Sequence, residues 1–256
     1  MNKRKAFSVL LSIALLISTL GSFPSALAAS GTAYCYMFSY TAKPSTNPHD
    51  YGYLNPNVFF DTTDVKGSFI GHMGNTQSIY GPGCGYSPTT VITNGSASSV
   101  YSSIQSGKVF FYHGHGAPGM LTLYDANGYY NGNLVSHSYQ ATDPKDYNLG
   151  GLGATALSSE KCVLYIGCNT GVSVTNTMGT FNLVSITVSK GAGFALGTKR
   201  TTYVGENSMF LDKFWIAANK GKTIDECIEF ACVKPGQYGL KREDLYYVGN
   251  LSQKLN

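Results

Sequence analysis

Two short apolar runs constrain this chain most: VFFY at 109–112 and CVLYI at 162–166. Neither run alternates apolar with polar residues, so a strand formed by either of them would be buried on both faces. Amphipathic segments lie between such runs along the chain. Continuous apolar strands that alternate with amphipathic helices are typical of a mostly parallel sheet covered on both faces. The sequence therefore predicts an α/β fold with helices on both sides of the sheet.

The other predicted elements follow one another from TTVIT at 89–93, a β-branched run that predicts a buried strand. Apolar residues then recur at helical spacing from Ala97, between a capping Ser96 and a closing Gly107, which predicts a helix. Further along, the pattern predicts a hairpin over 120–130 that turns at Asn127-Gly128, a helix over 181–193, a strand over 194–198, a helix over 206–221 and a helix that begins at the capping box Thr223–Glu226.

The N-terminus has the pattern of an export signal. A basic stretch at 3–5 precedes an apolar run at 7–20, and Ala-Leu-Ala at 26–28 supplies a small-x-small cleavage site. The apolar run is shorter than the ~20 residues that a membrane-spanning helix needs. We therefore expect residues 1–28 to be removed and the mature protein to be soluble and secreted, with no membrane contact after cleavage.

The sequence of residues 29–88 indicates its secondary structure less clearly than the rest of the chain does. A strand pattern at 32–42 gives way to Pro, Asn, Gly and Asp, so the segment is either an edge strand with loops or a propiece. Residues 89–256 are expected to form the main domain. Without the first 28 residues the chain has 228, which is enough for one sizeable core.

Charge and cysteine content exclude several partners and cofactors. The signal holds three of the 18 basic residues and none of the 14 acidic ones, which leaves a net charge of about +1. Nucleic acid or an anionic membrane would favour a clear basic excess, so neither is expected as a partner. Export permits disulfides among the six cysteines, and their pairing stays open. Because no CxxC and no Cys/His cluster has zinc spacing, we expect no metal and no other cofactor.

Both apolar strands end in residues that a turn does not need. The first runs into His113-Gly114-His115-Gly116 and the second into Gly167-Cys168-Asn169. Active sites of open parallel sheets lie beyond the carboxyl ends of the strands. A cysteine is a nucleophile as thiolate, a histidine transfers protons near neutral pH, and backbone N–H groups stabilise an oxyanion. Cys168, His115 and Gly116 would supply these three functions if the strand ends are neighbours.

These two blocks, in this order, resemble the caspase–gingipain–legumain clan of cysteine peptidases. FFYHGHG is similar to the clan's F-Y-S-G-H-G form, and VLYIGCNTG resembles the L-S-A-C-x-T-G block of the caspase-like CHAT domains. KGAGFALGT and the helical segments after it resemble their last strand and paired helices, so the resemblance covers about 89–232. It implies a caspase-like three-layer α/β/α sandwich and a cysteine endopeptidase that cleaves proteins or peptides. It also implies that His115 and Cys168 are catalytic, with the amides of Gly116 and Cys168 as the oxyanion hole.

One position departs from the clan's pattern. Clostripain-like secreted relatives carry an acidic residue two positions before the cysteine, as part of their preference for Lys or Arg, whereas this chain has Ile166. No arginine is placed to indicate a preference for Asp either. The P1 specificity therefore stays open, with His113 and Asn169 as the residues that would shape the pocket.

Other interpretations of the same residues stay open. Cys168 could be an ordinary buried thiol, and His113 could be a buried structural histidine. A His-x-His pair also suits a metal, although a metallo-hydrolase would want Asp-His next, where Ala117-Pro118 follow. The α/β-hydrolase elbow is absent around Cys168. The alternative to an enzyme is a catalytically silent caspase-fold domain that serves as an extracellular binding module.

Overall fold

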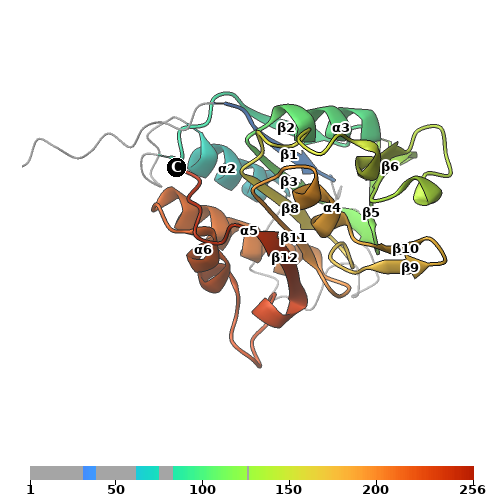
Figure 1. The fold of residues 1–256 in the computed structure, drawn as a ribbon. Helices are drawn as coiled ribbons and strands as arrows, with labels where there is room; N and C mark the ends of the chain where they lie inside the picture. Colours follow the sequence, from blue (N-terminus) through green and yellow to red (C-terminus); the bar gives the residue numbers. More distant parts are fainter. Residues whose placement is uncertain (1–30, 39–61, 75–82, 126) are drawn as a thin grey trace, which may run out of the picture.

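A computed structural model describes residues 31–38, 62–74, 83–125 and 127–256 of the chain, and the predicted signal at 1–28 lies outside them. A six-stranded sheet runs through the centre of the molecule in the order β2-β1-β3-β8-β11-β12 (Figure 1). Its strands are β1 (Ala33–Met37), β2 (Thr89–Thr93), β3 (Val109–His113), β8 (Cys162–Ile166), β11 (Phe194–Thr198) and β12 (Leu245–Gly249).

Five strands of this sheet are parallel, and only β12 is antiparallel to its neighbour β11. Helices cover both faces: α2 (Thr62–Met73), α5 (Val204–Asn219) and α6 (Ile224–Ala231) lie on one side, and α3 (Ala97–Ser106) and α4 (Leu183–Ser189) lie on the other (Figure 1). The predicted α/β class, a three-layer α/β/α sandwich with a mostly parallel sheet, is confirmed.

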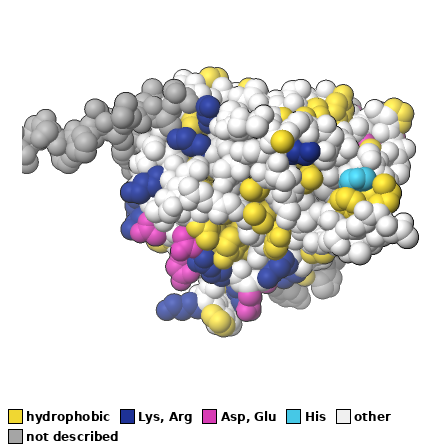
Figure 2. All heavy atoms as spheres, in the orientation of Figure 1, with side chains coloured by type: hydrophobic (Ala, Val, Ile, Leu, Met, Phe, Trp, Pro, Cys, Tyr) yellow, Lys and Arg dark blue, Asp and Glu magenta, His cyan; other side chains and the backbone are white. Residues whose placement is uncertain are grey.

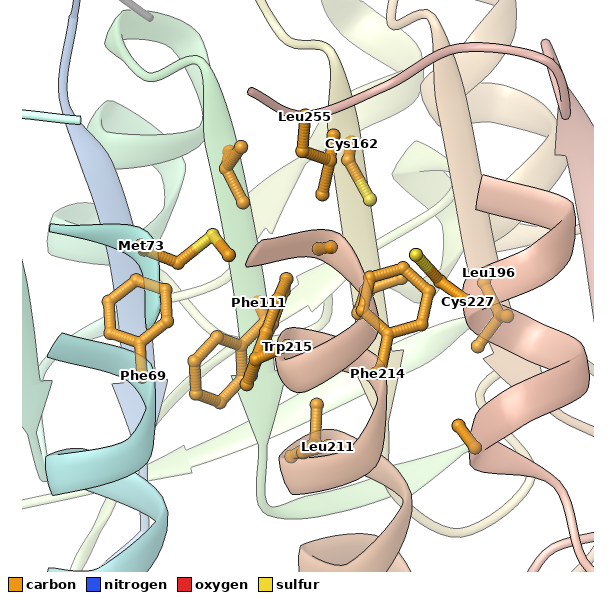
Figure 3. Packing of buried hydrophobic residues seen from close by; sticks show 14 of the residues in the cluster. Phe69, Met73, Phe111, Cys162, Leu196, Leu211, Phe214, Trp215, Cys227 and Leu255 are labelled. Carbon is orange, nitrogen blue, oxygen red and sulfur yellow. The ribbon is translucent and has the colours of Figure 1, made fainter. Parts of the chain in front are cut away.

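The two faces of the sheet are lined by alternate residues of the same strands. In β3, Phe110 and Tyr112 pack with the side chains of α3 and α4, whereas Phe111 packs with α2 and α5. Figure 3 shows the second of these clusters, in which Trp215 of α5 lies 5.4 Å from Phe111 and 5.7 Å from Phe69 of α2 between ring centroids. Because both faces of β3 and β8 are covered, their sequences need no polar positions.

β1 is not the edge strand that one of the two interpretations of residues 29–88 expected. β1 lies between β2 and β3 and is paired with both along its whole length, and four of its five side chains are buried. β2 is the edge strand instead, and its side chains are only partly buried, which corrects the prediction of a buried strand at 89–93. A run of apolar residues predicts burial but not the order of strands, so the sequence did not show which of the two lies at the edge.

Helix α2 was not predicted, because glycines at 67 and 71 interrupt its sequence and weaken the apolar pattern. Phe69 and Met73 nevertheless pack into the core beside α5. The other predicted helices are confirmed. Ser96 caps α3 through a 3.1 Å bond from the amide of Ser99, and the predicted capping box begins α6.

A smaller four-stranded sheet extends β3 beyond its end, and only its hairpin was predicted. Its strands are β4 (His115–Ala117), β5 (Met120–Tyr124), β6 (Tyr130–Val135) and β7 (Tyr147–Asn148). The pairing of β5 with β6 is antiparallel, which confirms that hairpin. The remaining elements are the hairpin β9 (Val174–Asn176) and β10 (Gly179–Phe181) and the 3₁₀ turns η1 (Ser138–Gln140), η2 (Leu149–Gly151) and η3 (Arg242–Asp244).

Charged side chains of both signs lie together on the face drawn in Figure 2, around α6 and the residues after it. Arg242 pairs with Asp225 and with Glu229, the latter at 3.3 Å, and Lys222 pairs with Glu226 at 2.9 Å. This part of the surface therefore carries no excess of one sign. Within the described ranges no helix has the length and apolar character that a membrane crossing requires.

Candidate active site

The two predicted strand ends are neighbours. β3 and β8 pair in parallel with His113 opposite Ile166, and the amide of Gly114 donates to the carbonyl of Ile166 at 3.2 Å. His115 follows two residues after His113, and Cys168 follows two residues after Ile166. Both residues therefore come directly after the carboxyl ends of adjacent parallel strands.

The backbone of His115 is fixed by the second sheet. His115 belongs to β4 and pairs with Thr122 of β5, and its carbonyl accepts a 2.5 Å hydrogen bond from the hydroxyl of Tyr112. The same hydroxyl lies 2.7 Å from the carbonyl of Thr122, so one buried tyrosine contacts both paired residues. β4 turns the chain away from the end of β3, and His115 is exposed at that turn.

Two aromatic rings contact the imidazole of His115. Its centroid lies 4.9 Å from the ring of Phe38, at the end of β1, and 5.3 Å from the ring of Tyr124, at the end of β5. The two rings also contact each other at 5.3 Å. Because this packing keeps part of the imidazole from water, burial lowers the pKa of His115 below its ordinary value. At neutral pH His115 is therefore mostly the neutral imidazole, a form that can accept a proton.

His113 has a different environment. It is fully buried on the face of β3 that carries Val109 and Phe111, and burial, with a smaller effect from the neighbouring His115, lowers its pKa to about 4. A histidine with this pKa is neutral throughout the physiological range. Its side chain is part of the packed interior, which supports the structural interpretation of His113 over the pocket interpretation.

Cys168 lies in the short loop that follows β8 and is half-buried. Its sulfur is 3.6 Å from the carbonyl oxygen of Thr202, in the segment between β11 and α5. Asn169 has a φ of 56° and donates from its amide to the carbonyl of Arg200 at 3.0 Å. The loop therefore turns sharply after the thiol and is attached to the end of the next strand.

Two buried threonines, Thr170 and Thr198, anchor this loop through hydrogen bonds. The hydroxyl of Thr170 donates to the carbonyl of Tyr165 at 2.5 Å and accepts from the amide of Thr198 at 3.1 Å. The hydroxyl of Thr198 in turn donates to the carbonyl of Gly167. These bonds satisfy two carbonyls that precede Cys168 and one amide of β11, so the loop is attached to both β8 and β11.

Glycines allow the strand ends to approach closely. A methyl group on Gly116 would lie 2.4 Å from Cγ2 of Thr170 and 3.0 Å from the carbonyl oxygen of Cys168. A methyl group on Gly167 would lie 2.5 Å from the carbonyl oxygen of Gly114 and 3.5 Å from the amide nitrogen of Gly116. The amide of Gly116 is therefore next to Gly167, the residue that immediately precedes the amide of Cys168.

The segment on the other side of Cys168 is anchored by ion pairs. Arg200, two residues after β11, pairs with Glu206 of α5 at 2.9 Å and with Asp244 of η3 at 3.0 Å. Glu206 also accepts from the amide of Tyr203 at 3.1 Å, which caps the start of α5. The guanidinium of Arg200 is therefore paired with two carboxylates, which neutralise its positive charge beside this loop.

The structure thus places the predicted residues His115, Gly116, Cys168 and Asn169 just beyond the ends of β3 and β8, with Gly116 against Cys168, and it sets His113 in the packed interior. Residues that the sequence did not indicate are Phe38, Tyr124, Thr170 and Thr198. Alternation in MLTLY places Tyr124 on one face of its strand, but nothing in the sequence shows which residue that face meets. The described part of the chain contains no group of three or more His, Cys, Asp or Glu side chains that could hold a metal ion.

Comparison with known proteins gives a loose structural likeness. No family model matches the chain, and no curated protein matches it. Two crystal structures of the Saccharomyces cerevisiae separase–securin complex overlap with it, at TM-scores of 0.43 and 0.39 and with 12% and 11% identical residues. Each overlap covers 92% of this chain and 13% of the other, so the chain spans about an eighth of that protein's length. A likeness this loose assigns no family and no activity to the chain.

Proposed function

We propose that this protein is a secreted, caspase-like cysteine endopeptidase in which Cys168 is the nucleophile and His115 carries the proton. The observation that carries the proposal is the parallel register of β3 and β8, which ends with His113 opposite Ile166, two residues before His115 on one side and two residues before Cys168 on the other. The strand-end motifs that resemble the caspase–gingipain–legumain clan occur on these two strands. Protein or peptide substrates follow from the same resemblance.

The reaction would begin with transfer of the thiol proton of Cys168 to the neutral imidazole of His115. The resulting thiolate attacks the carbonyl carbon of the scissile peptide bond, and the carbonyl oxygen becomes an oxyanion. The amides of Gly116 and Cys168, on either side of Gly167, would donate to that oxygen. When the carbon–nitrogen bond breaks, His115 returns the proton to the leaving amine and a thioester remains on Cys168. Water hydrolyses the thioester and regenerates the thiol.

Three features of the site support this assignment of roles. The lowered pKa of His115 keeps its imidazole able to accept a proton at neutral pH. A side chain at position 116 would collide with Thr170 and press on the carbonyl oxygen of Cys168, so glycine is needed there for the two strand ends to approach. The bonds of Thr170 and Thr198 fix the backbone that carries the thiol. A nucleophile and its proton carrier need this kind of fixed geometry.

The residues at positions 166 and 200 bear on which P1 side chains the site would accept. With Arg200 paired to Glu206 and Asp244, and with Ile166 two residues before the cysteine, neither a free arginine nor an acidic residue stands at these positions. We therefore propose that neither position 166 nor position 200 selects substrates by the charge of their P1 side chain. The second candidate function is the silent caspase-fold binding module, in which the same strand ends act only as scaffold.

Export is the second part of the proposal. The basic and apolar pattern at 3–20 and the cleavage pattern at 26–28 support removal of residues 1–28 by a signal peptidase. Amino-terminal sequencing of the protein recovered from the culture medium of an expressing bacterium should give a first residue at or next to Ala29. Protein retained in cells with its first residues intact would contradict export.

Cleavage of a mixed peptide library, identified by mass spectrometry under reducing conditions, tests the peptidase. The purified protein should produce cuts that disappear in Cys168→Ala and in His115→Gln. Cys232→Ala is the matched control, because Cys232 is the other half-buried cysteine and lies outside the site, at the end of α6. Cleavage that survives Cys168→Ala would remove Cys168 from the reaction, and a folded parent that cuts nothing would favour the binding module.

Alkylation of the thiols gives a test that needs no substrate. Cys35, Cys84, Cys162 and Cys227 are buried, and burial raises the pKa of Cys232 to about 12, so its thiolate is scarce at neutral pH. Iodoacetamide at pH 7 should therefore modify Cys168 first, and peptide mapping will identify the site. Equal labelling of Cys168 and Cys232 would contradict an activated thiol at position 168. Loss of the preference in His115→Gln would tie the reactivity to the imidazole.

A further inference from the structure

We propose that Phe38 and Tyr124 are positioning residues that hold the imidazole of His115 at the sheet edge where Cys168 lies. This inference rests on the proposed peptidase function. It starts from the three rings, which contact one another in pairs: His115 with Phe38, His115 with Tyr124, and Phe38 with Tyr124. The imidazole therefore occupies a corner formed by two aromatic side chains.

His115 needs such contacts because its side chain is exposed and would otherwise rotate. Its backbone is fixed by the pairing of β4 with β5, but its side chain stands at an exposed turn. An imidazole at such a position would sample several rotamers, and only those directed at the thiol are useful for proton transfer. All three pairs of rings are close to perpendicular, with interplanar angles of 67° to 70°. Edge-to-face contacts of this kind are favoured by the charge distribution of aromatic rings.

The two rings are themselves attached to the framework of the sheet. The amide of Phe38 donates to the carbonyl of His113 at 2.9 Å, which continues the pairing of β1 with β3. The amide of Tyr124 donates to the hydroxyl of Tyr36 at 3.3 Å. Tyr36 stacks on Tyr112 at 5.1 Å between centroids, and Tyr112 donates to the carbonyl of His115. Strands β1, β3 and β5 are therefore connected around the same histidine.

Phe38 and Tyr124 stand at the margin of the central core, although Tyr36 and Tyr112 belong to it and Phe38 packs against it. Phe38 and Tyr124 lie at the carboxyl end of β1 and at the end of β5, where both are only partly buried, and both contact His115. The titratable groups of the site are His113, Tyr124 and Cys168, and the lowered pKa of His115 is attributed to burial alone. Loss of either ring should therefore change the hydration of the imidazole without changing a charged neighbour.

The first measurement is the titration of His115 by NMR in protein with labelled histidine, compared with Tyr124→Leu and Phe38→Leu. Each substitution removes a ring but keeps an apolar side chain. The pKa of His115 should rise toward 6.5 in both variants, because water replaces the ring. Tyr124→Phe keeps the ring and should leave the titration unchanged. His137, which contacts Phe181 at 4.0 Å in another part of the molecule, provides an internal reference.

The second measurement is peptide cleavage by the same variants. Tyr124→Leu and Phe38→Leu should lower kcat by about tenfold to a hundredfold with little change in KM, because substrate binding is kept while the proton carrier is misplaced. Tyr124→Phe should retain most of kcat. Thermal unfolding of each variant separates this effect from loss of fold.

Each outcome decides something. A shift in the titration together with a fall in kcat supports the positioning role. A titration that does not move in either leucine variant overturns it, and so does a shifted titration with unchanged kcat. Damage from Tyr124→Phe equal to that from Tyr124→Leu would assign the effect to the hydroxyl and not to the ring. Absence of any cleavage by the folded parent removes the peptidase proposal itself and the catalytic role of the rings with it, whereas the titration still decides whether the rings contact His115.

Discussion

His113 and Ile166 lie opposite each other in β3 and β8, and this one register decides where the two chemically useful residues meet. Because the strands are parallel, two further residues on each bring His115 and Cys168 to the same edge. Had the register slipped by one residue, the two strand ends would no longer stand at the same level. The proposed chemistry thus depends on a pairing between two residues that take no part in it.

Gly116→Ala should abolish peptide cleavage. Its methyl group would overlap Cγ2 of Thr170 and press on the carbonyl of Cys168. Overpacking of this kind costs roughly 1–3 kcal/mol of folding free energy. Urea unfolding should show that loss, and adding Thr170→Ser should recover part of it because the overlapping methyl group is removed. The control is Gly153→Ala, where the added methyl group meets no atom within 4 Å.

A result in which Gly116→Ala keeps both its stability and its cleavage activity would contradict the close approach of the two strand ends. A result in which stability falls but Thr170→Ser restores none of it would locate the overlap elsewhere. These two readings separate the position of Gly116 from its proposed role at the oxyanion.

Thr170→Val should destabilise the loop that carries Cys168. The substitution keeps the shape of the side chain but leaves the carbonyl of Tyr165 and the amide of Thr198 without the bonds that the hydroxyl makes. Buried groups that lose a partner cost about 1–3 kcal/mol each. Differential scanning calorimetry should show a lower Tm for Thr170→Val, whereas Thr170→Ser, which keeps the hydroxyl, should stay close to the parent. Equal Tm values for the two variants would refute the structural role of the hydroxyl.

Glu160, two residues before β8, should make the protein less stable as the pH rises. It is 1% exposed, and neither carboxylate oxygen has a hydrogen-bond partner among the described residues. Burial raises its pKa well above the ordinary value, against a smaller opposing effect of Lys108. The stability associated with the protonated carboxyl is fully present below the unfolded pKa of 4.5 and is lost as the pH rises through the higher folded pKa.

Urea unfolding between pH 5 and pH 8 measures this effect. The unfolding free energy of the parent should fall over that range, and Glu160→Gln should flatten the fall because its side chain is neutral at every pH. Glu243→Gln is the matched control, since the side chain of Glu243 is 73% exposed. A parent and a Glu160→Gln variant with the same pH dependence would show that the carboxylate of Glu160 is solvated or paired.

A chain that begins at residue 89 should fail to fold, whereas one that begins at residue 29 should fold. The shorter chain lacks β1, so β2 and β3 lose the strand that lies between them, and the core loses α2 as well. Circular dichroism and size-exclusion chromatography will distinguish a cooperative, compact protein from an unfolded or aggregated one. If the chain from residue 89 folds and cleaves peptides, residues 29–88 are a removable propiece, as one alternative from the sequence predicts.

The sequence by itself determined the layered fold and indicated the candidate residues of the proposed site. Continuous apolar runs at 109–112 and 162–166 require cover on both faces, and a parallel sheet between two layers of helices provides it. Capping residues such as Ser96 and the Thr223–Glu226 pair fix helix ends through contacts within four residues, so they can be identified from sequence alone. The motifs at the strand ends likewise indicate His115 and Cys168 as candidates, because the chemistry of an imidazole or a thiol depends on the residue type and can be read from the sequence.

Only the tertiary structure decided the order of the strands and the surroundings of the histidine. Apolar content is the same whether β1 lies at the edge or between β2 and β3, since burial depends on neighbours far away in the sequence. The contacts of Phe38 and Tyr124 with His115 join segments 77 and nine residues distant from it, and no spacing rule links them. Residue type is a local property, whereas the meeting of three rings at one sheet edge is set by the packing of the whole chain.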